Sequence, residues 1–183
     1  ARQTRERLAK GQMKMAHSVA STVFVHAGVT SGALRRLGGG AAAGGGHVEA
    51  LNARARWALS DKEHHDDFII TGDGTGQMGP SADGPAWTRS LGEEANCTEV
   101  VSVLLALGAD RMVKGYDLQR DGEAKSMCGG KLLLTDTFMS EGYTGDRKTS
   151  ERNLMALEMS TEGDDIQFVY PLRTDDATCK KVT

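Results

Sequence analysis

The sequence lacks any long apolar run, and this absence sets the first limit on what the chain does. None of its apolar stretches approaches the roughly 20 residues that a membrane-spanning helix requires. We therefore expect a soluble chain without a membrane span. An excess of basic residues is also absent, because 22 Lys and Arg stand against 25 Asp and Glu, for a formal net charge of -3. Binding to a phosphate backbone needs a basic surface, so we expect no nucleic-acid partner.

Cysteine is scarce, with Cys97, Cys128 and Cys179 as the whole complement. An odd number at wide spacing suits neither a disulfide framework nor a zinc site of paired cysteines, and we expect a reducing compartment of unspecified organelle. The N-terminus lacks both an initiating Met and an apolar signal core, since Ala1 is followed by charged residues. This start predicts a processed product or part of a longer chain.

A short apolar run, Thr22–Val25, stops at a histidine followed by small residues. β-Branched and aromatic residues favour a buried strand, and Gly28 lets the backbone turn sharply after it. His26 then lies at a strand tip, which is where ligands bind in α/β sheets. These residues alone leave open whether His26 is a ligand or a hydrogen-bonded surface histidine.

The length and the periodicity of the chain predict a single domain, 1–183, with a layered α/β fold. Apolar residues at helical spacing predict helices over 47–59 and 94–107, and Gly108 is typical of the end of the second. Cys97 falls on the apolar face of that helix, which favours a small core residue over a reactive thiol. Apolar runs predict further strands, and therefore a mixed sheet, over 111–113, 131–136, 154–159 and 166–170.

Two segments interrupt this pattern. Residues 38–46 are a Gly/Ala run that we expect to be a flexible insertion, because it lacks the Gly-Lys-Ser/Thr ending of a P-loop. Residues 60–90 are expected to be a long loop. Within that loop, we interpret 72–76 as an ordinary glycine turn and 64–67 as solvated charge rather than a metal site.

Residues 5–15, before the first strand, fit either the end of a helix or a crossing loop. Near the end of the long loop, Asp83–Arg89 places a large aromatic residue beside an arginine after a turn. The planar guanidinium of Arg89 suits a phosphate or carboxylate ligand, and it equally suits pairing with a surface acid.

Several motifs in this order resemble the C-terminal half of Shewanella-like protein phosphatases, which belong to the calcineurin-like metallophosphoesterase superfamily. The resemblance runs from about Gly11 to Met159. The motifs that carry it are Phe24-Val25-His26-Ala27-Gly28, Gly84-Pro85-Ala86-Trp87-Thr88-Arg89, Cys97 in a helix ending Leu107-Gly108-Ala109-Asp110-Arg111-Met112-Val113, Gly129-Gly130-Lys131, and Asp136-Thr137-Phe138-Met139-Ser140.

The resemblance implies a β-sandwich flanked by helices, with two divalent metals, Mn, Fe or Zn, at strand-end loops. Two metals roughly 4 Å apart clamp a phosphate and activate a bridging water for in-line attack. By this resemblance, His26 matches a metal-binding histidine and Arg89 matches an arginine that grips the substrate phosphate. The implied substrate is a phosphoprotein.

The sequence also departs from the family pattern. Gly115-Tyr116-Asp117 stands where the family has Gly-His-Thr, so a neutral phenol replaces the imidazole of the expected second histidine. Phe138 stands where the family has a small glycine. The motifs of the family's first half, which supply most of its metal ligands, do not occur before Thr22.

These departures favour a degenerate or truncated phosphatase-like domain that is non-catalytic and serves as a binding or structural module in a larger assembly. The alternative is an active metal-dependent phosphoprotein phosphatase whose N-terminal half lies outside this sequence. A plain α/β domain unrelated to phosphatases is the third possibility. In a partial sheet, we expect the strand at Thr22 to have an exposed edge that recruits a protein partner.

Overall fold

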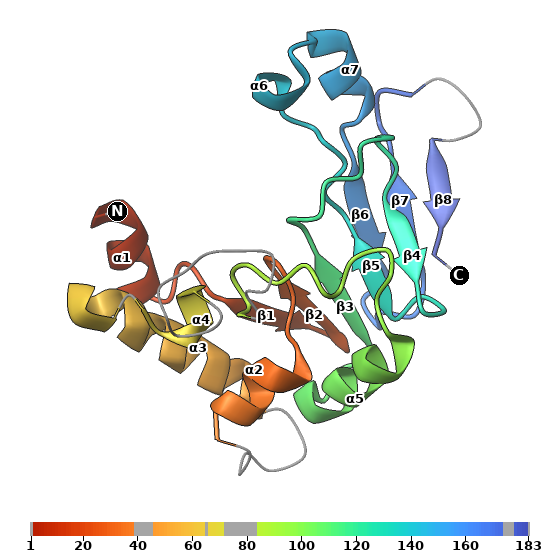
Figure 1. Ribbon diagram of the computed structural model, residues 1–183. Helices are drawn as coiled ribbons and strands as arrows, with labels where there is room; N and C mark the ends of the chain where they lie inside the picture. The colour runs from red at the N-terminus through yellow and green to blue at the C-terminus, as the bar shows by residue number, and fades with distance from the viewer. Residues whose placement is uncertain (1, 39–45, 65, 72–83, 174–177, 183) are drawn as a thin grey trace.

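The computed structural model describes residues 2–38, 46–64, 66–71, 84–173 and 178–182. Within these ranges the chain alternates short helices and strands (Figure 1). In chain order the elements are α1 (Arg2–Ala9), β1 (Ala16–Val19), β2 (Thr22–Val25), α2 (Ser31–Arg36), α3 (Gly46–Ser60), the 3-10 helix η1 (Lys62–His64), α4 (Phe68–Thr71), α5 (Cys97–Leu107), β3 (Arg111–Lys114), β4 (Lys125–Met127), β5 (Leu132–Leu134), α6 (Glu141–Thr144), α7 (Arg147–Arg152), β6 (Ala156–Met159), β7 (Ile166–Val169) and β8 (Cys179–Lys181).

The main sheet has five strands in the order β1-β2-β3-β5-β4. Its three inner strands, β2, β3 and β5, run parallel, whereas β1 and β4 pair antiparallel at the two edges. This mixed sheet with flanking helices confirms the predicted α/β class. The expectation of an exposed edge at β2 is wrong, because β1 returns through a tight turn and pairs along the whole of β2.

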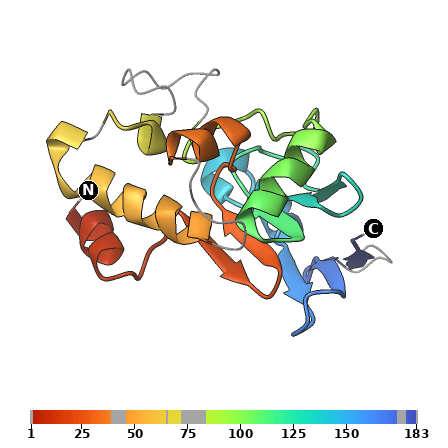
Figure 2. The ribbon, with the colours of Figure 1, turned by 90° about the horizontal axis from the view of Figure 1, so that it is seen from below.

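Successive side chains along the central strands point to opposite faces of the main sheet, so they contribute to two separate hydrophobic cores. Met112 and Leu132 face a cluster formed with the helices, whereas Val113 and Leu133 face a cluster formed with β6 and β7. Helices α2, α3 and α5 therefore cover one face of the main sheet, and the antiparallel sheet β6-β7-β8 lies against the other (Figure 2). The predicted layered arrangement is present in this form.

Helix α5 is the clearest case in which local sequence determines structure. The side chain of Asn96 accepts hydrogen bonds from the backbone N–H groups of Thr98 and Glu99, so the helix begins at Cys97 rather than at 94. Gly108 ends it with φ 66°, the left-handed conformation that favours glycine. The chain bends at His26 and Ala27 after β2, and Gly28, three residues past the end of the strand, has φ 133°, so the predicted turn is confirmed.

Two cysteine predictions are wrong: that Cys97 is a core residue, and that the spacing of the cysteines does not suit a disulfide. Cys97 is exposed at the start of α5, and it forms a disulfide with Cys128, with a Cα–Cα distance of 5.3 Å. The turn between β4 and β5 brings Cys128 to the helix N-terminus, a proximity that a separation of 31 residues does not reveal. Cys179 is exposed and free. The cysteine pattern therefore gives no support for a reducing compartment.

The segments predicted as loops contain some regular structure. Residues 5–15 hold the end of α1 and then a crossing loop, and the segment 60–90 holds η1 and α4. Asp67 is paired with Arg54 with 7 % of its side chain exposed, so the reading of 64–67 as solvated charge is wrong for this residue. Residues 39–45, 65 and 72–83, with the 72–76 glycine turn, lie outside the described residues. No helix in the described ranges is long and apolar enough to cross a membrane.

Candidate functional site at the strand ends

The carboxyl ends of β2, β3 and β5 meet at one edge of the main sheet. They are held in register beyond the last strand residues, because Gly115 N–H donates to His26 O at 3.0 Å and Thr135 N–H donates to Lys114 O at 2.9 Å. The loop that carries Arg89 is joined to the same edge, since Ala27 N–H donates to Pro85 O at 3.2 Å. Segments distant in sequence thus converge where open α/β sheets bind ligands.

The predicted site residues His26, Tyr116 and Arg89 lie together at this edge. The rings of His26 and Tyr116 are 5.1 Å apart between centroids, and the Arg89 guanidinium carbon lies 4.4 Å from the Tyr116 centroid. Trp87 meets the same tyrosine edge-on at 5.7 Å. Tyr116 therefore occupies the centre of the group, in contact with all three neighbours. We call these four residues the strand-end site.

A cavity of about 500 Å³ opens beside the strand-end site. Its lining combines aromatic rings with a few polar groups, and includes His26, Arg89, Tyr116, Asp136, Phe138 and Tyr143. Asp136 was not singled out as a site residue from sequence. Its position as the last residue of the predicted strand 131–136 was the available signal, because strand-end residues of neighbouring parallel strands share an edge.

Tyr116 and Phe138, the two positions where the sequence departs from the resembled family, both have left-handed backbones. Their φ angles are 68° and 63°, a region that large side chains adopt at a cost of about 1–2 kcal/mol. The conformation at 138 is one that glycine adopts freely. The backbone at Phe138 is therefore of the kind expected at a glycine position, although it carries a bulky ring.

A buried lysine anchors the loop after β3 to the loop that carries Arg89. Lys114 is 1 % exposed, and its Nζ donates to Leu91 O at 3.2 Å and is ion-paired with Asp117. Burial lowers the pKa of Lys114 from 10.5, in opposition to the hydrogen bond and charge of Asp117, which raise it. Lys114 was not identified from the sequence. The one signal was its position directly after the apolar residues of the predicted strand 111–113.

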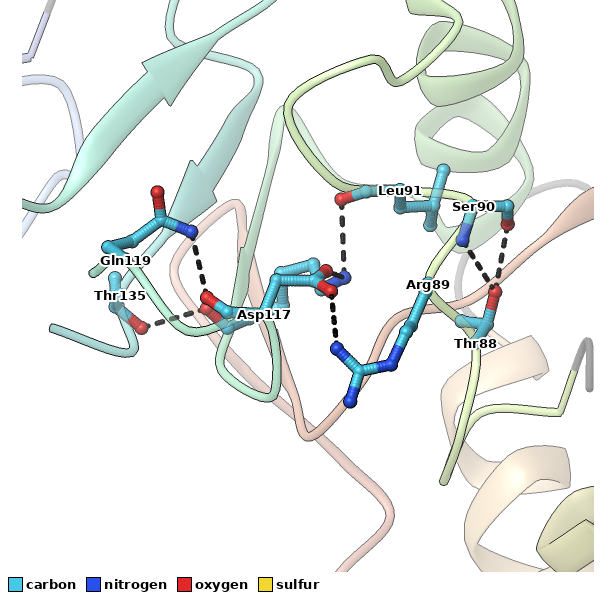
Figure 3. A network of polar contacts seen from close by, with 8 residues as sticks. Thr88, Arg89, Ser90, Leu91, Asp117, Gln119 and Thr135 are labelled. Atoms are coloured by element: carbon cyan, nitrogen blue, oxygen red, sulfur yellow. Dashed lines mark hydrogen bonds and ion pairs between the residues drawn. The ribbon is translucent and has the colours of Figure 1, made fainter. Parts of the chain in front are cut away.

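Asp117 is the acceptor at the centre of this network. Arg89 donates to its Oδ1 at 3.5 Å, a long contact, while Lys114 is bound to Oδ2. The amide of Gln119 donates to the backbone oxygen of Asp117 at 2.8 Å, and Thr135 donates to Lys114 O at 2.9 Å (Figure 3). These bonds fix Asp117 more firmly than Arg89, whose side chain is 53 % exposed.

The described residues do not fit a two-metal centre. In the ranges that the structure describes, no group of three or more His, Cys, Asp and Glu side chains is placed to hold a metal ion. His26 has the phenol-bearing Tyr116 as its neighbour, and the Asp117 carboxylate is engaged by Lys114. A metal at the strand-end site would therefore need ligands from beyond these residues.

Comparison with known proteins supports a phosphatase-like fold. The structure resembles the crystal structure of the cold-active protein-tyrosine phosphatase of a psychrophilic Shewanella species, with a TM-score of 0.60, 14 % identity, and coverage of 93 % of this chain and 43 % of that one. Another structure of a cold-active protein tyrosine phosphatase gives a TM-score of 0.61 at 16 % identity, with coverage of 92 % and 41 %. The chain thus spans about two fifths of the length of these solved chains.

Sequence comparison adds one relative. The uncharacterized protein C1840.07c of Schizosaccharomyces pombe is 37 % identical over 68 residues, which are 36 % of this chain and 20 % of that protein. No protein-family model matches the chain. The fold is therefore phosphatase-like. These comparisons do not show membership of the particular family that the sequence motifs resemble.

Proposed function

We propose that this chain is a degenerate domain related to the Shewanella-like phosphatases, which binds a phosphorylated protein without hydrolysing it. The observation that carries the proposal is Tyr116, which stands between His26 and Arg89 and contacts both. The phenol ring of Tyr116 thereby stands where the resembled family has a metal-binding histidine, while Arg89, whose cation suits a phosphate, is kept. Binding is retained and the means of activating water is lost.

Arg89 is the phosphate-binding group in this proposal. Its guanidinium is about half exposed and stacks on Tyr116, which orients it, and its contact with Asp117 is long at 3.5 Å. An arginine fork binds a phosphate through two parallel charge-assisted hydrogen bonds, which are stronger than this contact. Rings around the adjacent cavity offer an apolar surface to the rest of a phosphorylated side chain.

Two measurements on the purified chain test the proposal. Fluorescence polarisation with a phosphotyrosine peptide is expected to show binding that Arg89→Ala weakens about 10-fold or more, the loss of a charged hydrogen bond. Arg147→Ala is the matched control, since Arg147 is exposed and pairs with Glu151 on its own helix. A phosphatase assay with Mn²⁺ is expected to show no turnover; turnover that His26→Ala abolishes would overturn the non-catalytic assignment.

An active metal-dependent phosphoprotein phosphatase is the second candidate. It is favoured by the meeting of His26, Arg89 and Asp136 at one cavity. In this case, two divalent metals, Mn, Fe or Zn, would be held by His26 together with ligands from another segment or chain. Calorimetry on Tyr116→His separates the candidates, because metal uptake by this variant requires those further ligands to be present.

A protein partner is also part of the proposal. Strand β1 is an edge strand of the main sheet, and its residues His17, Ser18 and Val19 are exposed. Unpaired edges of this kind recruit further strands. Sedimentation of the isolated chain is expected to show self-association or instability; a monodisperse, cooperatively unfolding monomer would contradict a need for a partner.

A further inference from the structure

A second cavity, of about 700 Å³, lies next to the cavity of the strand-end site and shares the lining residues Arg89 and Leu118 with it. It is formed between two loops, residues 89–94 before α5 and residues 117–120 after β3. The lysine bridge from Leu91 O to Asp117 joins these same loops. We call this space the acceptor cavity, because of the oxygen atoms described next.

Gln119 is the first indication of a ligand in the acceptor cavity. It lines the cavity, it is 1 % exposed, and its Oε1 has no hydrogen-bond partner among the residues that the structure describes. Its Nε2 is engaged with Asp117 O, which fixes the amide with Oε1 directed away from that contact (Figure 3). A buried carbonyl oxygen without a donor carries a desolvation penalty that a ligand donor would remove.

Three carboxylates and two arginines line the cavity, and two of these carboxylates, Glu93 and Asp117, are already ion-paired with lysines. Glu94 lines it and is exposed, without an ion pair in the described part of the chain. Asp117 lines it too; its Oδ2 is paired with Lys114, and its Oδ1 has a long contact of 3.5 Å with Arg89, which a phosphate bound by Arg89 would replace. Glu93 is already paired with Lys125. Arg120 also lines the cavity, and its positive charge opposes the attraction of a cation to these carboxylates.

These residues do not form a metal site, because the described part of the chain has no group of three or more His, Cys, Asp or Glu side chains placed to hold a metal ion. A flexible organic cation that carries several N–H donors fits them better. Because the two cavities share Arg89, a ligand with its phosphate at the strand-end site would reach the acceptor cavity with the residues next in its chain.

We infer that the acceptor cavity selects phosphoproteins with a lysine or arginine within two residues of the phosphorylated residue. The inference rests on the proposed binding of a phosphorylated protein and names its sequence preference. The basic side chain donates to Gln119 Oε1 and pairs with Glu94 and Asp117, while the phosphate binds Arg89. Arg120 limits this preference by repelling the same cation.

The experiment compares phosphotyrosine peptides that are identical except for lysine or norleucine at each position within two residues of the phosphotyrosine. Fluorescence polarisation is expected to show 2- to 5-fold tighter binding for lysine at one or more positions, the size of a partly exposed ion pair. Glu94→Gln is expected to abolish the difference, and Arg120→Gln is expected to enlarge it. Neither substitution touches a described hydrogen bond of the fold.

The outcomes separate this inference from the function on which it rests. Equal binding of lysine and norleucine peptides, with both weakened by Arg89→Ala, would overturn the basic-residue preference and leave phosphate binding intact. A lysine preference that Glu94→Gln does not change would place the preference outside the acceptor cavity and also overturn the inference. Absence of binding by every peptide would overturn both statements.

Discussion

Removal of the Cys97–Cys128 disulfide is expected to lower the stability of the fold substantially. The bond closes a loop with a sequence separation of 31 residues. For a loop of this size, the entropy removed from the unfolded chain is about 12 cal/mol/K, or about 3.7 kcal/mol at 25 °C. For a domain of this length, that loss corresponds to a fall in melting temperature of roughly 10 °C.

The assay is thermal unfolding followed by circular dichroism on the double variant Cys97→Ser, Cys128→Ser. Cys179→Ser is the matched control, because Cys179 is exposed and free and closes no loop. Reductant is expected to lower the melting temperature of the wild type and of the control to that of the double variant. It should not change the double variant itself.

A double variant whose melting temperature falls by less than roughly 2 °C would refute the loop-entropy reasoning, because the calculated loss is several times larger.

Three further changes test other parts of the fold. Burial lowers the pKa of Lys114 in the folded chain below 10.5. Between these two pKa values the unfolded chain binds more protons than the folded chain, so the free energy of unfolding is expected to rise with pH. Urea titrations at several pH values should show this rise in the wild type and not in Lys114→Met. Asn52 bonds the backbone of Met15 and Ala16 in three contacts, so Asn52→Leu is expected to cost about 3 kcal/mol in urea denaturation, and a cost below about 1 kcal/mol would contradict the structural role. Both Phe138→Gly and Phe138→Ala remove the ring, but only glycine relieves the left-handed backbone, so the glycine variant should be about 1 kcal/mol more stable by thermal unfolding; equal stabilities would show that φ 63° is not strained.

Much of the local structure follows directly from the sequence. The run Thr22–Val25 forms the predicted strand, and its end places His26 at a strand tip. Asn96 and Gly108 bound α5 through their own cap hydrogen bonds and backbone angles. Such features depend on contacts within a few residues, and for that reason they are readable in one dimension.

The site was predictable in part. His26, Tyr116 and Arg89 were identified from motif positions, and the structure brings them together. Lys114 and Gln119 were not identified, because each acquires its significance from burial against a loop distant in sequence. The partner of Cys97 was missed for the same reason, since a β-turn determines where Cys128 lies.

By itself, the sequence determined the strands β2, β3, β5, β6 and β7, the capped helix, and the identity of a histidine, a tyrosine and an arginine at predicted loop positions, whereas β1, β4 and β8 were not predicted. Tertiary structure decided how they combine: β1 closes the edge of β2, and Tyr116 lies between His26 and Arg89. It also decided that Lys114, buried beneath both loops, holds them together. Local propensity acts through neighbours along the chain, whereas sheet order and burial depend on contacts made across it.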